Sequence, residues 1–223
     1  MAERRITALE IQKHDKDRVN VYLDGQYAFG LSRIAAARLK TGQVLTQAEV
    51  EALCALDEVT RAVDYAVRLL ARRPYSSAEI RQRLNARRFA DSAIDQALAR
   101  LADLGYVDDL AFARYWVESR ERSSPRGPQA LRYELRQKGL PADVIEAALA
   151  ETQALDSALR AAQPALRRWR GLARADVRQK LGAFLSRRGF DYETVHEAVS
   201  MVIAQLENEE PDYFAPDDET DNE

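Results

Sequence analysis

The stretch from Leu131 to Leu149, LRYELRQKGLPADVIEAAL, decides the fold, because its apolar spacing occurs three times in the chain. Each copy places two apolar residues one helical turn apart, a third in a turn, and two more on a second helix. The copies comprise Ile80, Leu84, Phe89, Ile94 and Leu98; Leu131, Leu135, Leu140, Ile145 and Leu149; and Leu181, Leu185, Phe190, Val195 and Val199. The offsets between copies are 51 and 50 residues, and such an internal repeat predicts stacked helical units.

The turns between the paired helices support the repeat. In QKGL and RRGF, Gly139 and Gly189 stand at helix C-terminal positions that favour a left-handed conformation, whereas the first copy has Arg88 where a glycine is expected. Pro164 predicts a kink or break in the helix that precedes the last pair. A third helix precedes each pair, with apolar stripes at Val63, Ala66, Val67 and Leu70; at Phe112, Trp116 and Val117; and at Leu155, Leu159, Ala162, Leu166 and Trp169.

The first thirty residues predict a three-stranded antiparallel β meander. RITALEIQK, RVNVYL and QYAFGL are short and rich in β-branched and aromatic residues, and Asp24-Gly25 between the last two is a strong hairpin signal. Ser32 predicts the cap of a short helix that ends near Gly42. Capping boxes follow at Thr46 with Glu49, where a helix to Arg73 begins, and at Ser76 with Glu79.

We therefore expect a mainly α protein, with tandem three-helix repeats that form an elongated curved rod after a small N-terminal β meander. The predicted domains are the meander and short helix (1–45), three repeats (46–108, 109–152 and 153–206), and an acidic tail (207–223). The tail carries nine acidic and no basic residues, which leaves 33 basic and 27 acidic residues, a net charge of +6, in the body. This composition predicts disorder in the tail, which serves as a solubility tail or as an internal competitor for an anionic partner.

Composition also narrows the function. No apolar run approaches the ~20 residues that span a bilayer, and MAERRITALEIQ lacks the apolar core of a secretory signal, so we expect a cytoplasmic monomer with no membrane contact. The single cysteine, Cys54, excludes an internal disulfide and predicts a buried apolar role.

Catalytic motifs are nearly absent from the sequence. His14 and His196 have no metal-ligand spacing to each other or to the cysteine, and we expect no metal and no cofactor. The paired carboxylates Asp108 and Asp109 suit either a cation site or the cap of the helix that follows, and the cap is the stronger interpretation. A catalytic role would predict turnover that falls when both become asparagine, but we expect a protein that is not an enzyme.

Basic residues lie beside the apolar stripe in every repeat. Arg87, Lys138 and Arg188 share one helical phase, and Arg81, Arg132 and Gly182 share another. Such a series suits an extended anionic partner, or it is the solvated face of each helix. The candidate partner-binding residues are Arg81, Arg87, Arg88, Arg126, Arg132, Arg136, Lys138, Arg187 and Arg188.

The segments RPYSSAEIRQRL, LGYVDDLAFARYWVESR and SPRGPQALRYELRQKGL resemble the succession of motifs in the RecX family of bacterial recombination regulators. The resemblance spans about residues 58–205 and leaves the N-terminal meander and the tail outside. It implies an all-helical repeat protein without a catalytic site, which binds the RecA recombinase filament on DNA and inhibits its ATPase and strand-exchange activities, with consequences for homologous recombination and the SOS response.

On this interpretation the Pro125-Arg126-Gly127-Pro128 turn leads into the central repeat, and Arg126, Arg132, Arg136 and Lys138 face the filament. We add the hypothesis that successive repeats contact successive filament subunits. The alternative is a helical-repeat protein that binds single- or double-stranded DNA directly through its arginines. A DNA binder should lose affinity steeply with salt on DNA alone, whereas a filament regulator should need the recombinase.

Overall fold

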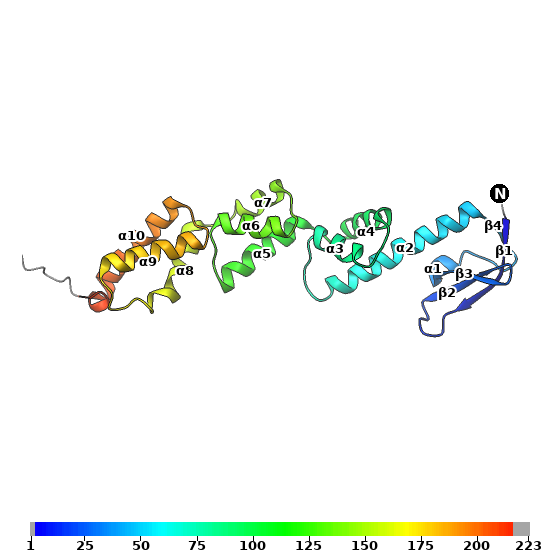
Figure 1. The fold of residues 1–223 in the computed structure, drawn as a ribbon, viewed down its shortest axis with the longest axis horizontal. Helices are drawn as coiled ribbons and strands as arrows, with labels where there is room; N and C mark the ends of the chain where they lie inside the picture. Colours follow the sequence, from blue (N-terminus) through cyan, green and yellow to red (C-terminus); the bar gives the residue numbers. More distant parts are fainter. Residues whose placement is uncertain (1–2, 216–223) are drawn as a thin grey trace, which may run out of the picture. The chain divides into compact units, whose positions relative to one another are not determined.

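The computed structural model describes residues 3–215, which divide into two compact units at Asp108 and Asp109 (Figure 1). Within the described residues there are ten α-helices and one antiparallel sheet of four strands. The first unit holds the sheet and four of the helices, and the second unit holds the other six. The predicted fold class, mainly α with an N-terminal antiparallel sheet and three-helix repeats, is confirmed.

The sheet contains one strand more than the predicted meander. Strands β1 (Glu3–Ile11), β2 (Arg18–Leu23) and β3 (Gln26–Ser32) form the meander, and β4 (Val44–Thr46) pairs with β1, giving the order β3-β2-β1-β4. Asp24 and Gly25 both have positive φ, as the predicted hairpin requires. The three predicted strands are confirmed, whereas β4 was not predicted because it spans only three residues, too few for an alternating apolar pattern.

Two helices pack against this sheet. The short helix α1 (Arg33–Ala36) ends well before Gly42, and α2 (Gln47–Leu70) begins at the predicted Thr46–Glu49 capping box but stops before Arg73. The carboxylate of Asp57, on α2, is buried and accepts hydrogen bonds from the Arg18 guanidinium (2.8 Å) and the Ser32 amide (3.1 Å). This ion pair ties the helix to the sheet and was not predicted from the sequence.

The repeated apolar positions form the cores of three helical units. The first consists of the C-terminal part of α2 with α3 (Ser77–Asn85) and α4 (Asp91–Asp103). Thirteen of the fifteen repeated positions are buried, and the exceptions, Phe89 and Leu98, are half-buried. The repeat inferred from the sequence is therefore the repeat that builds the core.

The turn after α3 has the same backbone conformation as the equivalent turns of the other two repeats, although it contains an arginine in place of the glycine. Gly139 and Gly189 have φ of 76° and 84°, and Arg88 adopts the same left-handed conformation with φ of 62°. A residue with a Cβ atom is disfavoured there by about 1–2 kcal/mol. The turn therefore keeps its left-handed backbone conformation even though arginine disfavours it.

Replacing this residue by glycine should stabilise the protein. We expect Arg88→Gly to raise the free energy of unfolding by about 1 kcal/mol, because the strain at φ of 62° disappears. Urea denaturation of the full chain measures the difference, with Arg88→Lys as the control that removes no strain. A lower stability of Arg88→Gly than of the lysine control would contradict the assignment.

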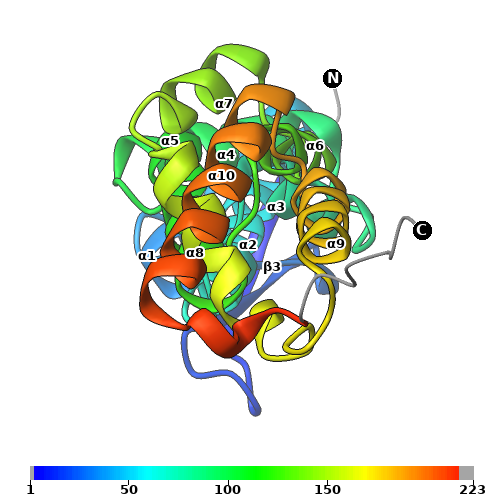
Figure 2. The ribbon, with the colours of Figure 1, turned by 90° about the vertical axis from the view of Figure 1, so that its left-hand side faces the viewer.

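The second unit contains two repeats. The central repeat comprises α5 (Asp109–Ser123), α6 (Pro128–Gln137) and α7 (Ala142–Leu149), and the last repeat comprises α8 (Ala154–Leu166), α9 (Arg174–Arg187) and α10 (Tyr192–Glu209). In the last repeat α10 packs on both α8 and α9, and the three form a bundle in Figures 1 and 2. Pro164 lies inside α8 without splitting it.

The chain remains ordered beyond the predicted start of the tail. Helix α10 continues to Glu209, and a 3-10 turn, η1 (Pro211–Tyr213), follows. The buried Tyr213 donates its hydroxyl hydrogen to the Leu166 carbonyl (2.6 Å). Disorder predicted from residue 207 is therefore wrong for 207–215, because Tyr213 provides an apolar anchor that the acidic composition conceals; residues 216–223 lie outside the described residues.

Candidate functional site

The basic series Arg87, Lys138 and Arg188 has a common structural role. Each cation lies over an aromatic ring: Tyr65 for Arg87 (4.9 Å), Trp116 for Lys138 (4.6 Å) and Phe184 for Arg188 (4.6 Å to the ring centroid). Each also lies at the C-terminal end of the second helix of its repeat, where the helix dipole favours a positive charge. The series therefore stabilises the repeat that carries it.

The second basic series forms ion pairs between neighbouring helices. Arg81 on α3 pairs with Asp95 on α4 (2.5 Å). Arg132 on α6 makes two hydrogen bonds to Glu146 on α7 (2.7 and 2.9 Å), which raise the pKa of Arg132 and lower that of Glu146. Both arginines thus have an acidic partner within their own repeat.

The last repeat lacks this ion pair. The equivalent positions hold Gly182 on α9 and His196 on α10, and the ring of Tyr192 stacks on His196 with centroids 6.2 Å apart. Tyr192 is 82% exposed. The first two repeats each have an ion pair at these positions, whereas the last repeat has a histidine that stacks on an exposed tyrosine.

The Pro-Arg-Gly-Pro turn forms the contact between the central and last repeats, and we call this contact the joint. The amide of Gly127 donates to the Arg188 carbonyl (2.9 Å), and the amide of Gln129 donates to the Gly189 carbonyl (3.1 Å). The unpaired amides at the start of α6 thus satisfy the unpaired carbonyls at the end of α9. Gly127 is buried, and a Cβ atom built on it would lie 2.1 Å from the Gly189 oxygen.

Arg188 fastens the joint. Its guanidinium donates hydrogen bonds to the Ser124 hydroxyl oxygen and the Pro125 carbonyl, both at 3.0 Å. Burial lowers the pKa of Arg188, and the nearby positive charge of Arg126 lowers it further. Arg188, one of the predicted partner-binding residues, connects two repeats in the structure.

Glu134 on α6 interacts with two further arginines, Arg120 and Arg126, and with Trp116. Its Oε2 atom accepts hydrogen bonds from the indole of Trp116 and from Nε of Arg120, both at 2.7 Å. Its Oε1 atom lies 3.1 Å from Nε of Arg126. We call Arg120, Arg126, Lys138, Arg188 and Glu134 the joint cluster. Sequence reasoning placed three of these arginine and lysine residues among the candidates but missed Arg120, Glu134 and their arrangement.

Four of the predicted partner-binding cations have exposed side chains. They are Arg87, Arg88, Arg136 and Arg187, which follow or end the second helices of the three repeats. The remaining candidates are half-buried in the contacts described above. Arg87 is exposed although its guanidinium also lies over Tyr65, so exposure alone does not separate it from the cations that stabilise the repeats.

The candidate catalytic carboxylates lie at a helix start. Asp109 is the first residue of α5 and Asp108 precedes it, as expected for acidic groups that oppose a positive helix end. Cys54 is half-buried, and burial followed by the charge of Asp57 raises its pKa. Within residues 3–215, no group of three His, Cys, Asp or Glu side chains is arranged to hold a metal ion. No helix of the described chain is long and apolar enough to cross a membrane.

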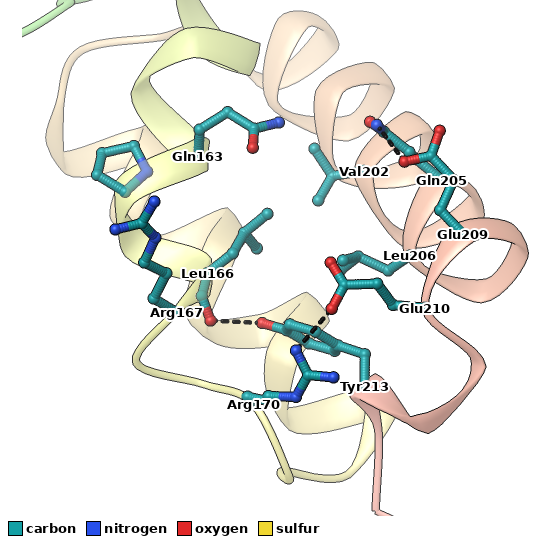
Figure 3. A pocket seen from close by; sticks show the side chains of 11 residues that line it. Gln163, Leu166, Arg167, Arg170, Val202, Gln205, Leu206, Glu209, Glu210 and Tyr213 are labelled. Atoms are coloured by element: carbon teal, nitrogen blue, oxygen red, sulfur yellow. Dashed lines mark hydrogen bonds and ion pairs between the residues drawn. The ribbon is translucent and has the colours of Figure 1, made fainter.

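A cleft of about 640 Å³ lies between α8 and the C-terminal part of α10 (Figure 3). Leu166, Val202 and Leu206 contribute apolar surface, and Gln163 and Arg167 lie on the α8 side. Two of its polar contacts are internal: Arg170 forms an ion pair with Glu210 (2.7 Å), and the Gln205 amide donates a hydrogen bond to Glu209 (2.9 Å). Some of the polar groups that line the cleft are therefore already bonded to one another.

The fold defines a protein of tandem three-helix repeats that follow a small N-terminal antiparallel sheet. Four family descriptions match in order: the N-terminal domain of regulatory protein RecX (residues 4–46) and the first, second and third three-helix domains of RecX (62–101, 108–149 and 151–199). The chain belongs to the RecX family. The match at 4–46 corrects the prediction that the N-terminal sheet lies outside the resemblance.

Relatives agree along most of the chain. A protein named Regulatory protein RecX from Listeria welshimeri is 30% identical over 87% of this chain and 74% of its own length, and one from Lacticaseibacillus casei is 32% identical over 92% and 79%. A crystal structure of regulatory protein RecX superposes with a TM-score of 0.73 at 27% identity, over 89% of this chain and 99% of that chain. RecX from Lactobacillus salivarius, at 19% identity and a TM-score of 0.61 over 66% and 97%, shares the fold.

Proposed function

We propose that this protein binds the RecA recombinase filament on DNA and inhibits its ATPase and strand-exchange activities, and so modulates homologous recombination and the SOS response. The observation that carries the proposal is the ordered match of all four RecX domains to one chain. The named role of the relatives as regulatory proteins supports it.

The exposed cations are the filament contacts in this proposal. Arg87, Arg88, Arg136 and Arg187 recur at the ends of second helices, so each repeat presents at least one guanidinium to solvent. Individually weak contacts of this kind add through effective concentration when they belong to one chain. Arg132 forms an ion pair with Glu146 on α7, and in this proposal its main role is to stabilise the central repeat.

The primary test is the ATP hydrolysis rate of the cognate recombinase on single-stranded DNA with increasing amounts of this protein, beside a binding titration on the same DNA without recombinase. Inhibition at concentrations that leave naked DNA unbound is the expected result. Inhibition only where the protein already coats the DNA would favour direct DNA binding.

The double variant Arg136→Ala with Arg187→Ala should inhibit the recombinase about tenfold less strongly than the parent, because two exposed guanidinium contacts are lost. The half-inhibitory concentration in the ATPase assay measures the change. Arg81→Ala with Arg132→Ala removes the same charge from paired positions and is the matched control. Equal inhibition by the two double variants would contradict the assignment of contacts.

A further inference from the structure

The joint cluster contains more positive charge than its carboxylate neutralises. Arg120 and Arg126 both contact Glu134, Lys138 lies over the ring of Trp116, and Arg188 lies near Arg126, so the charges of these five side chains sum to +3. Glu134 has two oxygens, and one of them already accepts from both Trp116 and Arg120. The cluster is therefore built to accept further negative charge.

Two of the guanidinium groups, those of Arg126 and Arg188, can accept a further anionic hydrogen-bond partner. The Nε atom of Arg126 is buried and makes no hydrogen bond within the described residues, although Glu134 is 3.1 Å away. The hydrogen bonds of Arg188 go to neutral oxygens of Ser124 and Pro125. Buried donors and charges of this kind are normally satisfied, and an anion or a water molecule is the usual partner.

We propose that the joint cluster is a binding site for a phosphate group. A phosphate presents several charged oxygens in a tetrahedral arrangement, and these match the forked donors of two neighbouring guanidinium groups. A carboxylate has only two oxygens, and the carboxylate already present leaves the Arg126 donor unsatisfied.

The cluster is accessible to such a ligand. The side chains of Arg120 and Arg126 are 32% and 38% exposed, whereas that of Glu134 is 16% exposed. The group arrives either as free phosphate or as a phosphodiester of a nucleic-acid backbone, which offers the same oxygens. Because Arg126 and Arg188 belong to different repeats, the ligand also strengthens the joint.

The position of Trp116 provides a direct measurement. Its indole donates to Glu134, and Lys138 lies over its ring, so an anion among these groups changes its fluorescence. The full chain has two tryptophans, and Trp169→Phe leaves Trp116 as the sole reporter. This variant is titrated with sodium phosphate against sodium chloride at constant ionic strength, and separately with a short oligodeoxythymidylate, in the absence of any recombinase.

We expect a saturable fluorescence change with phosphate, and affinity about tenfold weaker in Arg126→Gln and in Arg188→Gln. Arg187→Gln removes the same charge from the neighbouring exposed position and should change affinity less than about twofold. The same pattern with the oligonucleotide identifies nucleic acid as the source, whereas a response to phosphate alone identifies a small anion.

Three results would overturn the site: no saturable change with phosphate, an equal loss in Arg187→Gln, or equally tight binding of a glutamate-rich peptide, which would indicate an acidic protein surface as ligand. If Arg188→Gln separates the two repeats by removing the bonds to Ser124 and Pro125, the Arg126→Gln variant still tests the site. The titrations contain no recombinase, so their outcome is independent of the proposed inhibition of the filament.

Discussion

Gly127→Ala should destabilise the protein by about 3 kcal/mol or more, the largest effect that we expect from a single methyl group. The added Cβ atom would lie 2.1 Å from the Gly189 oxygen and 2.3 Å from the Phe190 nitrogen, both backbone atoms that no side-chain rotation can move away. The φ of Gly127 is −72°, which alanine adopts freely, so the loss is due to the clash and not to backbone strain. Urea unfolding, followed by tryptophan fluorescence, measures the change.

Gly182→Ala is the matched control in the same unit. This glycine lies inside α9, and its Cβ atom would meet only Val195 Cγ1 at an ordinary distance of 3.9 Å. Alanine is favoured over glycine in a helix, so we expect stability to rise by about 0.5–1 kcal/mol. Opposite signs for the two glycine-to-alanine changes would support close docking at the joint, and an unchanged stability of Gly127→Ala would rule it out.

Glu134→Gln should lower stability by about 2 kcal/mol, the value typical of hydrogen bonds to charged groups. Glutamine retains the volume and an acceptor for Trp116, but Arg120 and Arg126 lose the carboxylate that offsets their mutual repulsion. The side chain of Glu134 is 16% exposed, so solvent screens this interaction only partly.

Glu146→Gln is the corresponding control at an exposed ion pair. Glu146 is 54% exposed and bonds to Arg132, and such pairs contribute about 0.5 kcal/mol. Thermal unfolding at neutral pH compares the two variants. Equal small losses would show that Glu134 is as dispensable as a surface carboxylate and that the joint cluster carries no stabilising charge.

The amino-acid sequence by itself determined the repeat and its local structure. The spacing of residues such as Leu131 and Leu135 identifies the buried helix face, because a helix returns to the same face every 3.6 residues. The capping box at Ser76 and the left-handed turns at Gly139 and Gly189 follow from interactions within a few residues. The same local patterns failed for β4, which is too short to show one, and for Tyr213, which lies in an acidic segment.

Only the tertiary structure decided what the basic residues do. Arg132 and Arg136 are one helical turn apart and look equivalent in sequence, yet Arg132 bonds to Glu146 on another helix while Arg136 is exposed. Arg188 reaches the Ser124 hydroxyl across 64 positions of the chain. Periodicity specifies which face of a helix is buried. The partner of each polar side chain depends instead on how separate helices pack, and a local sequence pattern does not specify contacts between residues so far apart in the chain.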